Sequence, residues 1–359
     1  VKSSGDLYKY IEKQTKKGRK IHYLPQYRFD NILIIDQLMH IKSLKVNENV
    51  SKKFIKAVIE QRSIKADEEI EEIEKALEIS HKMNTEAMKL IEPGKVEREI
   101  FGKVEGIALS YGNGVSFPII FSVEGQILHN HSHDNVMKEG QIAVLDSGAE
   151  TTLGYASDIT RTIPISGTFS NKQKEIYNIV LQSQLKAIEM IQPDPKFKDI
   201  HIEAAKVIAK GLTDLGIMKG DVEEAVENGA HALFFPHGLG HMMGLDVHDM
   251  ENLGENYVGY DKSLKRSKQF GLAYLRLGKE LKSGYVVTVE PGCYFIPALI
   301  DKWESEKKHS NFINYEKLKE YRDFGGIRIE DDVLVTDQGF KVLGIPIPKT
   351  VDEVEKACE

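Results

Sequence analysis

The chain of 359 residues is 41% hydrophobic and 29% charged, so it can bury a sizeable core, and wholesale disorder is excluded. Its two cysteines cannot build a disulfide framework, and no stretch approaches the ~18 apolar residues of a membrane span. We therefore expect about two domains, a reducing compartment that we take to be the cytoplasm, and no membrane partner. The chain starts VKSSGDLYKY, without an initiator Met or an apolar leader, so we expect a processed or truncated form without a signal peptide.

Charge is spread unevenly along the chain. The formal net charge is -7, but residues 1–65 carry 15 Lys and Arg against 6 Asp and Glu, leaving 33 against 49 for the remainder. A basic segment is one signature of nucleic-acid binding. These lysines are scattered along expected helix faces without the aromatic platforms that stack bases. We therefore expect a solvated helix surface, or a charge match to the acidic remainder, and no nucleic-acid partner.

The start of the chain predicts a small α/β domain. An amphipathic helix, a short strand (KIHYLP) and a second helix are expected at 6–18, 20–25 and 51–62. A long helix over 66–94 stops at Pro93-Gly94 and follows the change in charge balance. We therefore place a boundary between a partial amino-terminal domain, residues 1–64, and a catalytic domain, residues 65–359.

The rest of the chain alternates between helical and strand-like texture. A helix over 96–112 is followed by strands expected at 117–123, 141–148 and 157–165. Two helices come next, at 171–191 and 199–217. Strands return at 284–295 and 325–339. The order helices, strands, helices, strands predicts an α+β domain.

Four carboxylates stand where strand structure would hold them still. Asp146 ends one expected strand, and Asp158 lies twelve residues later on the returning strand, so a hairpin can bring the two together. Glu290 ends another strand and is followed by proline. Glu330 follows Arg328 by two residues, which predicts one strand face for both. Taken singly, an acid at a strand end is more often a turn former or an ion-pair partner than a metal ligand.

Histidines cluster in two segments. The segment PHGLGHMMGLDVHD carries His237, His241 and His248. In HNHSHDN, we interpret His131 and His133 as residues of a polar loop rather than as a metal cluster. Four carboxylates and one imidazole together match the ligand set of a dinuclear site, with metals ~3.5–4 Å apart. Cys293 lies beside the TVEPG segment that carries Glu290, and we interpret it as a residue of the packed core.

The motifs DSGAETTLGYASDITRT, PHGLGHMMGLDVHD, TVEPGCYF and GIRIEDD make the sequence resemble the metal-dependent pita-bread peptidases, and within them the Xaa-Pro dipeptidases (prolidases) and aminopeptidases P. The resemblance covers roughly residues 65–355 and implies a pita-bread (creatinase/aminopeptidase) catalytic domain. It implies two divalent metal ions, usually Mn²⁺, with Co²⁺, Zn²⁺ or Fe²⁺ compatible with the same ligands. The family's ligands fall on Asp146, Asp158, His241, Glu290 and Glu330. Asp146 would serve one metal, His241 and Glu290 the other, and Asp158 and Glu330 both.

The resemblance also implies the catalytic roles. A metal-bridging hydroxide would attack the Xaa-Pro bond, with Glu290 as general base and proton shuttle. His248 would donate a hydrogen bond to the scissile carbonyl, while His129 and His237 would position the substrate and line the proline side. Arg328 would hold the ligand carboxylates in orientation. The implied partners are a proline-containing dipeptide or short peptide and a second copy of the chain in a homodimer.

Two features favour a dipeptidase over the alternative, an aminopeptidase P that acts on longer peptides. The insertion over 296–324 resembles prolidases. Arg276, fourteen residues before Glu290, matches the prolidase arginine that grips the substrate's terminal carboxylate, although a surface ion pair is an alternative interpretation. The loop over 249–271 has no family counterpart, so the length of the pocket stays open.

Other classes remain as alternatives. A metal-free scaffold of the same fold is the main one, and the presence of all five ligand types opposes it. A metal-free creatinase-like hydrolase would lack the carboxylate set. A methionine aminopeptidase would not carry the additional amino-terminal domain or the PHGLGHMMGLDVHD pattern.

Overall fold

The computed structural model describes residues 3–359, which fall into two compact units. The smaller unit contains residues 3–63 and Met250–Val258, and the larger contains Ile64–Asp249 and Gly259–Glu359. No helix within the described residues is long and apolar enough to span a bilayer.

The smaller unit is built from helices. These are α1 (Leu7–Lys16), α2 (Phe29–Met39), α3 (Lys52–Ser63) and α9 (Glu255–Val258). The strand predicted over 20–25 is wrong, because the described part of this unit contains no strand that could pair with it. Instead, the Tyr23 carbonyl accepts a hydrogen bond from the Ser51 amide at 3.2 Å, and the Tyr23 hydroxyl donates to the Val46 carbonyl at 3.0 Å. Helix α2 was not predicted from the sequence.

The larger unit combines antiparallel strands with long helices. The strands are β1 (Ile120–Ser122), β2 (Ile142–Ser147), β3 (Ile159–Pro164), β4 (Val286–Val289), β5 (Gly292–Tyr294), β6 (Gly326–Arg328), β7 (Asp331–Thr336) and β8 (Gly339–Val342). They pair in the orders β1-β2-β3, β4-β7-β8 and β5-β6. The helices are α4 (Asp67–Leu90), α5 (Glu97–Tyr111), α6 (Asn171–Glu189), α7 (Phe197–Asp214), α8 (Val222–Glu227), α10 (Pro297–Ser305), α11 (Tyr315–Leu318) and α12 (Val351–Ala357).

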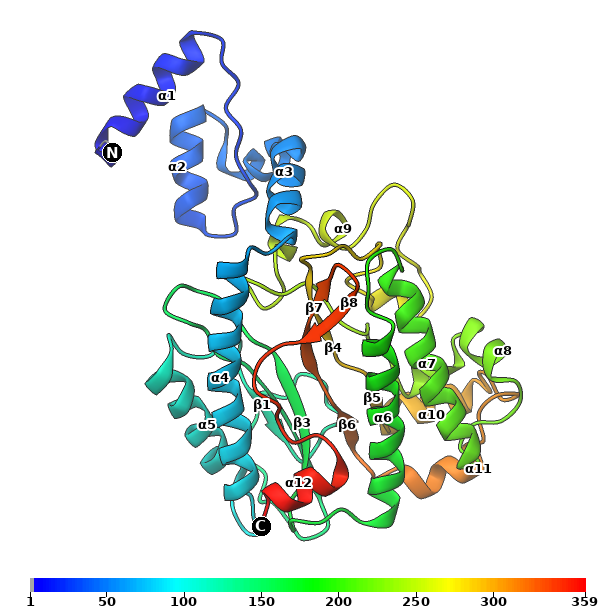
Figure 1. Ribbon diagram of the computed structural model, residues 1–359. Coiled ribbons are helices and arrows are strands. Elements are labelled where there is room, and N and C mark those ends of the chain that lie inside the picture. Colours follow the sequence, from blue (N-terminus) through cyan, green and yellow to red (C-terminus); the bar gives the residue numbers. More distant parts are fainter. Residues whose placement is uncertain (1–2) are drawn as a thin grey trace. The chain divides into compact units, whose positions relative to one another are not determined.

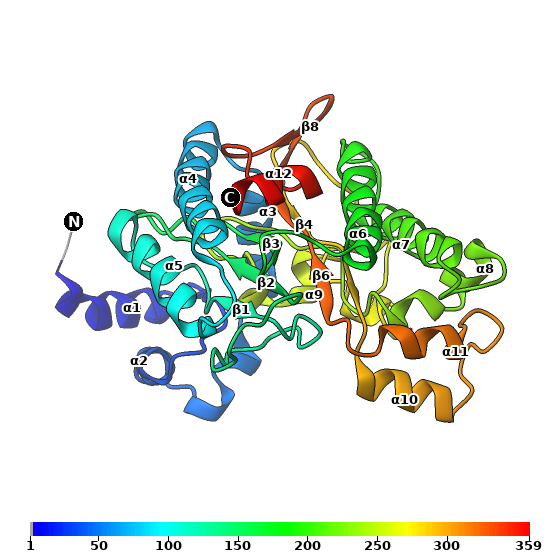
Figure 2. The ribbon, with the colours of Figure 1, turned by 90° about the horizontal axis from the view of Figure 1, so that it is seen from below.

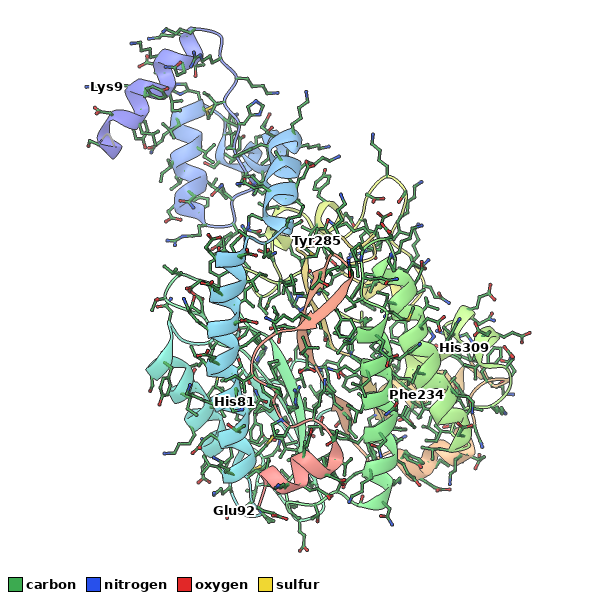
Figure 3. All side chains as sticks on the ribbon, viewed as in Figure 1. Lys9, His81, Glu92, Phe234, Tyr285 and His309 are labelled. Carbon is green, nitrogen blue, oxygen red and sulfur yellow. The ribbon has the colours of Figure 1, made fainter. Side chains whose placement is uncertain are left out.

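Helices flank the strands of the larger unit on two sides. Figures 1 and 2 show α4 and α5 along one side of the strands and α6 and α7 along the other. Covered in this way, β3 has all six of its residues buried, and its polar Thr160, Arg161 and Thr162 are hydrogen-bonded. Figure 3 labels Phe234, whose ring packs edge to face on Phe295 with the ring centroids 5.7 Å apart. The predicted α+β class is confirmed.

Two predicted strands are interrupted, and the interruptions matter for the site. The strand expected over 284–295 breaks at Glu290-Pro291 into β4 and β5, because proline has no N–H to donate to a ladder. The strand expected over 325–339 breaks after Arg328. Arg328 and Glu330 therefore do not share one strand, contrary to prediction: Arg328 ends β6 and Glu330 precedes β7. The Glu330 amide instead donates to the carbonyl of Thr160 on β3 at 3.0 Å.

Candidate metal centre

The β2–β3 hairpin sets the first pair of carboxylates. Its register places Asp146 opposite Thr160. Asp158 lies two residues before Thr160, and side chains two residues apart on an extended chain point to the same face. Asp146, Thr160 and Asp158 therefore share one side of the hairpin.

Three side chains from distant segments meet beside this hairpin. Asp158, His241 and Glu330 are buried, and each offers one ligand atom within 4.8 Å of the other two. Glu290 lies next to them, with its Oε1 at 4.0 Å from His241 Nε2. Asp146 is joined to the group through Arg328, whose Nη2 donates to Asp146 Oδ2 at 2.6 Å. Three of the five predicted ligands thus form one buried group, with Glu290 beside His241 and Asp146 bound to Arg328.

His241 presents an unprotonated nitrogen to this position. Its Nδ1 lies 3.0 Å from the Met242 carbonyl, which can only accept, so Nδ1 carries the proton and Nε2 a lone pair. Burial lowers the pKa of His241 to about 4, so the ring is neutral. Nε2 therefore offers a lone pair 3.4 Å from Asp158 Oδ2, and the two groups do not form an ion pair. A cation between these atoms could bind both.

Two of the carboxylates, Asp158 and Glu330, have too little positive charge nearby to balance their own charge. Burial, then repulsion by Glu330 and Asp146, raises the pKa of Asp158 well above its usual range. Burial, then repulsion by Glu290 and Asp146, does the same to the pKa of Glu330. Asp146 Oδ1 and Asp158 Oδ1 are buried without a hydrogen-bond partner. Oxygen and imidazole donors with unused lone pairs fit divalent cations such as Mn²⁺, Co²⁺, Zn²⁺ or Fe²⁺.

Arg328 orients two of the predicted ligands. Besides Asp146, its guanidinium donates to Thr160 Oγ1 at 3.1 Å and to the Tyr294 hydroxyl at 3.0 Å. Because Thr160 Oγ1 accepts from Arg328, its own hydrogen is free to donate to Glu330 Oε2, 2.6 Å away. One arginine thus fixes Asp146 directly and Glu330 through Thr160.

Three residues around the centre were not predicted from the sequence. Thr160 and Tyr294 form the network just described, and Asp332 Oδ2 accepts a hydrogen bond from the Asp158 amide at 3.0 Å. Thr160 could have been found, because it stands two residues after Asp158 on the same strand face. Tyr294 and Asp332 carried no such signal, because each reaches the centre from another strand.

His237 has both ring nitrogens engaged inside the protein. Nδ1 donates to the Gly238 carbonyl at 2.8 Å, so Nε2 accepts from the Tyr294 hydroxyl at 2.9 Å. Burial, then the charge of Arg328, lowers the pKa of His237 to about 3, so its 3.8 Å approach to Glu290 is not an ion pair. His237 can line the centre with its ring but has no nitrogen left for a substrate.

The other predicted substrate residues lie around the same position. The His248 ring is 4.2 Å from that of His241, measured between centroids, and repulsion from His241, followed by burial, lowers the pKa of His248 to about 2. Partial burial and the charge of Arg328 lower the pKa of His129, whose side chain is more exposed. The charge of Arg276 contributes to lowering the pKa of both His241 and His248.

The remaining candidates serve the fold. His133 stacks on Phe101 with centroids 4.1 Å apart, and its Nδ1 lies 3.0 Å from the Phe121 carbonyl, which anchors its loop. His131 is exposed, and Cys293 is buried in β5, where burial raises its pKa. None of the three joins the group of ligand atoms formed by the described residues.

Comparisons with known proteins agree on one family. Residues 71–337 match the model described as metallopeptidase family M24. The chain is 36% identical over 309 residues to an Xaa-Pro dipeptidase of Rattus norvegicus, which covers 84% of this chain and 61% of the rat protein. It is 36% identical over 334 residues to an Aspergillus clavatus protein named "Probable Xaa-Pro aminopeptidase", which covers 90% of this chain and 69% of the fungal protein.

A solved structure is similar over nearly the whole chain. Zinc-substituted Escherichia coli aminopeptidase P in complex with product superposes with a TM-score of 0.76 at 28% identity. The alignment covers 98% of this chain and 74% of that chain. The chain thus spans 61% of the rat dipeptidase's length and a larger share of the other two.

Proposed function

This chain belongs to metallopeptidase family M24, and from that premise we propose that it is a two-metal exopeptidase that hydrolyses Xaa-Pro dipeptides. The observation that carries the proposal is the buried group of Asp158, His241 and Glu330, whose ligand atoms face one another with unused lone pairs. The Xaa-Pro names of the relatives support the substrate class.

Two divalent cations, Mn²⁺ in our proposal, would be held by Asp146, Asp158, His241, Glu290 and Glu330. When bound, such cations would lower the pKa of a water molecule and so supply a nucleophile near neutral pH. The four carboxylates balance the formal charge of two divalent ions. The zinc-substituted relative supports divalent-metal chemistry at this fold.

Hydrolysis of an Xaa-Pro bond, like that of any amide, requires a proton for the leaving nitrogen, which departs as an amine. Glu290, beside the group, would take the proton released by the nucleophile and give it to that nitrogen. His248 is neutral at working pH and would donate a hydrogen bond to the scissile carbonyl oxygen. His129 would position the substrate, and His237 would form a wall on the proline side.

Arg276 would select dipeptides by binding the terminal carboxylate of the substrate. Its charge already acts on the two histidines that face the reacting bond. The second candidate is an Xaa-Pro aminopeptidase, and it is favoured by the name of the fungal relative and by the similarity to aminopeptidase P. Such an enzyme would admit a peptide beyond proline.

The deciding experiment compares Xaa-Pro dipeptides with Xaa-Pro-Yaa tripeptides in Mn²⁺, using wild type, Arg276→Ala and the exposed control Arg322→Ala. Turnover of dipeptides that falls in Arg276→Ala and persists in the control supports the dipeptidase. Equal or faster turnover of tripeptides supports the aminopeptidase. A wild-type protein that binds no divalent ion by isothermal titration calorimetry supports the metal-free scaffold instead.

Three further expectations remain predictions. They are the assignment of residues 1–64 to a partial amino-terminal domain, the homodimer and the cytoplasmic location. Analytical ultracentrifugation of the purified chain tests the dimer directly.

A further inference from the structure

A buried ion pair lies behind the predicted ligand His241. Lys65 Nζ donates to Asp249 Oδ2 at 2.9 Å, and each side chain is 1% exposed. Both residues belong to the larger unit, and each stands within two residues of a point where the chain passes between units. A pair so deeply buried is a poor source of stability, because desolvation offsets most of the attraction. We therefore look for a role of this pair other than stability.

Asp249 closes the loop that carries the histidines. Its amide donates to the Met242 carbonyl at 2.9 Å, and the same carbonyl accepts the Nδ1 proton of His241 at 3.0 Å. His248 is the residue before Asp249, and its ring packs on that of His241. One carbonyl thus anchors both the closing residue of the loop and the ring of a predicted ligand.

The ion pair is packed tightly against this loop, with no free space between them. A Cβ added to Gly244 would lie 2.8 Å from Asp249 Oδ2 and 2.9 Å from Lys65 Cε, so glycine leaves room for the pair. The Gly244 carbonyl accepts a hydrogen bond at 2.9 Å from the amide of Ala156, which stands two residues before Asp158. The pair therefore abuts the segments of two predicted ligands.

Lys65 is itself held in place by its backbone. Its amide donates to the Gly284 carbonyl at 2.8 Å. Gly284 directly precedes Tyr285, which Figure 3 labels, and leads into β4 and Glu290. The ammonium is thus tethered to the segment that carries a third predicted ligand.

We propose that Lys65 and Asp249 are positioning residues that fix the 242–249 loop, and through it the ring orientations of His241 and His248. The proposal rests on the proposed function for its catalytic consequence, but its structural part stands in the metal-free protein. The ion pair holds the loop closed, and the closed loop holds the Nε2 lone pair of His241 toward the carboxylates.

The test separates positioning from stability. Lys65→Met leaves a buried carboxylate unpaired, so its melting temperature should fall. The double variant Lys65→Met/Asp249→Leu replaces the pair with apolar groups and should recover the melting temperature. We expect it nevertheless to lose more than ten-fold in kcat, with KM changed less than three-fold. The control Lys174→Met/Glu355→Leu removes a partly exposed ion pair of the same 2.9 Å length that lies away from this loop, and it should keep wild-type kcat.

A second readout needs neither metal nor substrate. Ring ¹⁵N–¹H correlation spectra of the metal-free protein report which nitrogen of His241 carries the proton. We expect the Nδ1 tautomer in wild type and a mixture in the double variant. Wild-type ring signals in the double variant overturn the proposal, and so does wild-type kcat. If wild type hydrolyses no Xaa-Pro peptide, the proposed function fails, and the spectra alone decide the positioning role.

Discussion

Arg328 illustrates how one side chain can set several ligands. Its planar fork reaches Asp146, Thr160 and Tyr294 at 2.6–3.1 Å. A lysine has one compact ammonium and cannot make three such bonds in fixed directions.

We predict that Arg328→Lys weakens Mn²⁺ binding and lowers kcat, each by about ten- to hundred-fold, the usual cost of losing an outer-shell partner. Isothermal titration calorimetry and steady-state kinetics measure the two effects. Arg322→Lys changes an exposed pair with Asp301 and should leave both quantities unchanged. Wild-type metal affinity in Arg328→Lys would show that the guanidinium does not orient the ligands.

Glu330 gives a prediction about pH. Burial and nearby carboxylates hold its pKa well above the ordinary value, so the folded metal-free protein binds that proton more tightly than the unfolded chain does. Its contribution to stability therefore falls as the pH rises from the ordinary carboxyl pKa through the raised one. Glutamine cannot ionise and can still accept from Thr160.

We therefore expect Glu330→Gln to raise the melting temperature of the metal-free protein at about pH 8, by roughly 2 °C for each kcal/mol relieved, and by less at about pH 5. Thermal unfolding in a chelator measures both values. Exposed Glu139→Gln is the control and should show no such pH-dependent gain. A variant less stable than wild type at both values would contradict the repulsion argument.

Among the secondary-structure elements, the long helices were the most predictable. The expected helix over 66–94 is α4, and those over 171–191 and 199–217 are α6 and α7, because an apolar face repeats at helical spacing over many turns. The strand end at Glu290 was predicted from the proline that follows it, but the break after Arg328 was not. That break depends on a partner from another segment, because the Glu330 amide donates to the Thr160 carbonyl.

A loop whose anchoring also escaped prediction carries His129. Both ends of the segment 123–135 are bound by one buried carboxylate at the start of α5. Glu97 Oε1 accepts from the Val123 amide at 2.8 Å, and Glu97 Oε2 accepts from the Asn135 amide at 3.3 Å. Nothing in the sequence joins position 97 to position 129.

We predict that Glu97→Gln loosens this loop, because an amide has one oxygen where the carboxylate has two, so one of two part-buried N–H groups loses its partner. Amide exchange should rise across 124–135, and KM for a dipeptide should rise several-fold. Glu99→Gln is the control. Glu99 lies in the same helical turn, and its side chain accepts a hydrogen bond only from the Val96 amide, at the exposed start of the helix. Unchanged amide exchange across 124–135 in Glu97→Gln would show that Glu97 does not hold this loop in place.

For the molecule as a whole, the family and the pita-bread fold predicted from four motifs are confirmed. The motifs also named Asp158, His241 and Glu330, whose ligand atoms meet at the centre. The support by Asp332 and Lys65 could not be predicted, because Asp332 reaches Asp158 and Lys65 reaches Asp249 only once distant segments pack. Ligand identity is a local property of a motif, whereas orientation is a property of the fold.

Metal should therefore stabilise the larger unit specifically, since the predicted ligands belong to it. The single tryptophan, Trp303, is buried in α10 of the same unit, so its fluorescence reports the unfolding of that unit. Cations that bind only the folded state add about 2.7 kcal/mol at a hundred times their dissociation constant. We expect Mn²⁺ to raise the fluorescence melting temperature by several degrees over that in chelator, and Asp158→Ala/Glu330→Ala to abolish the rise. An equal rise in that variant would mean that Mn²⁺ binds elsewhere, and the centre described above would not be the metal site.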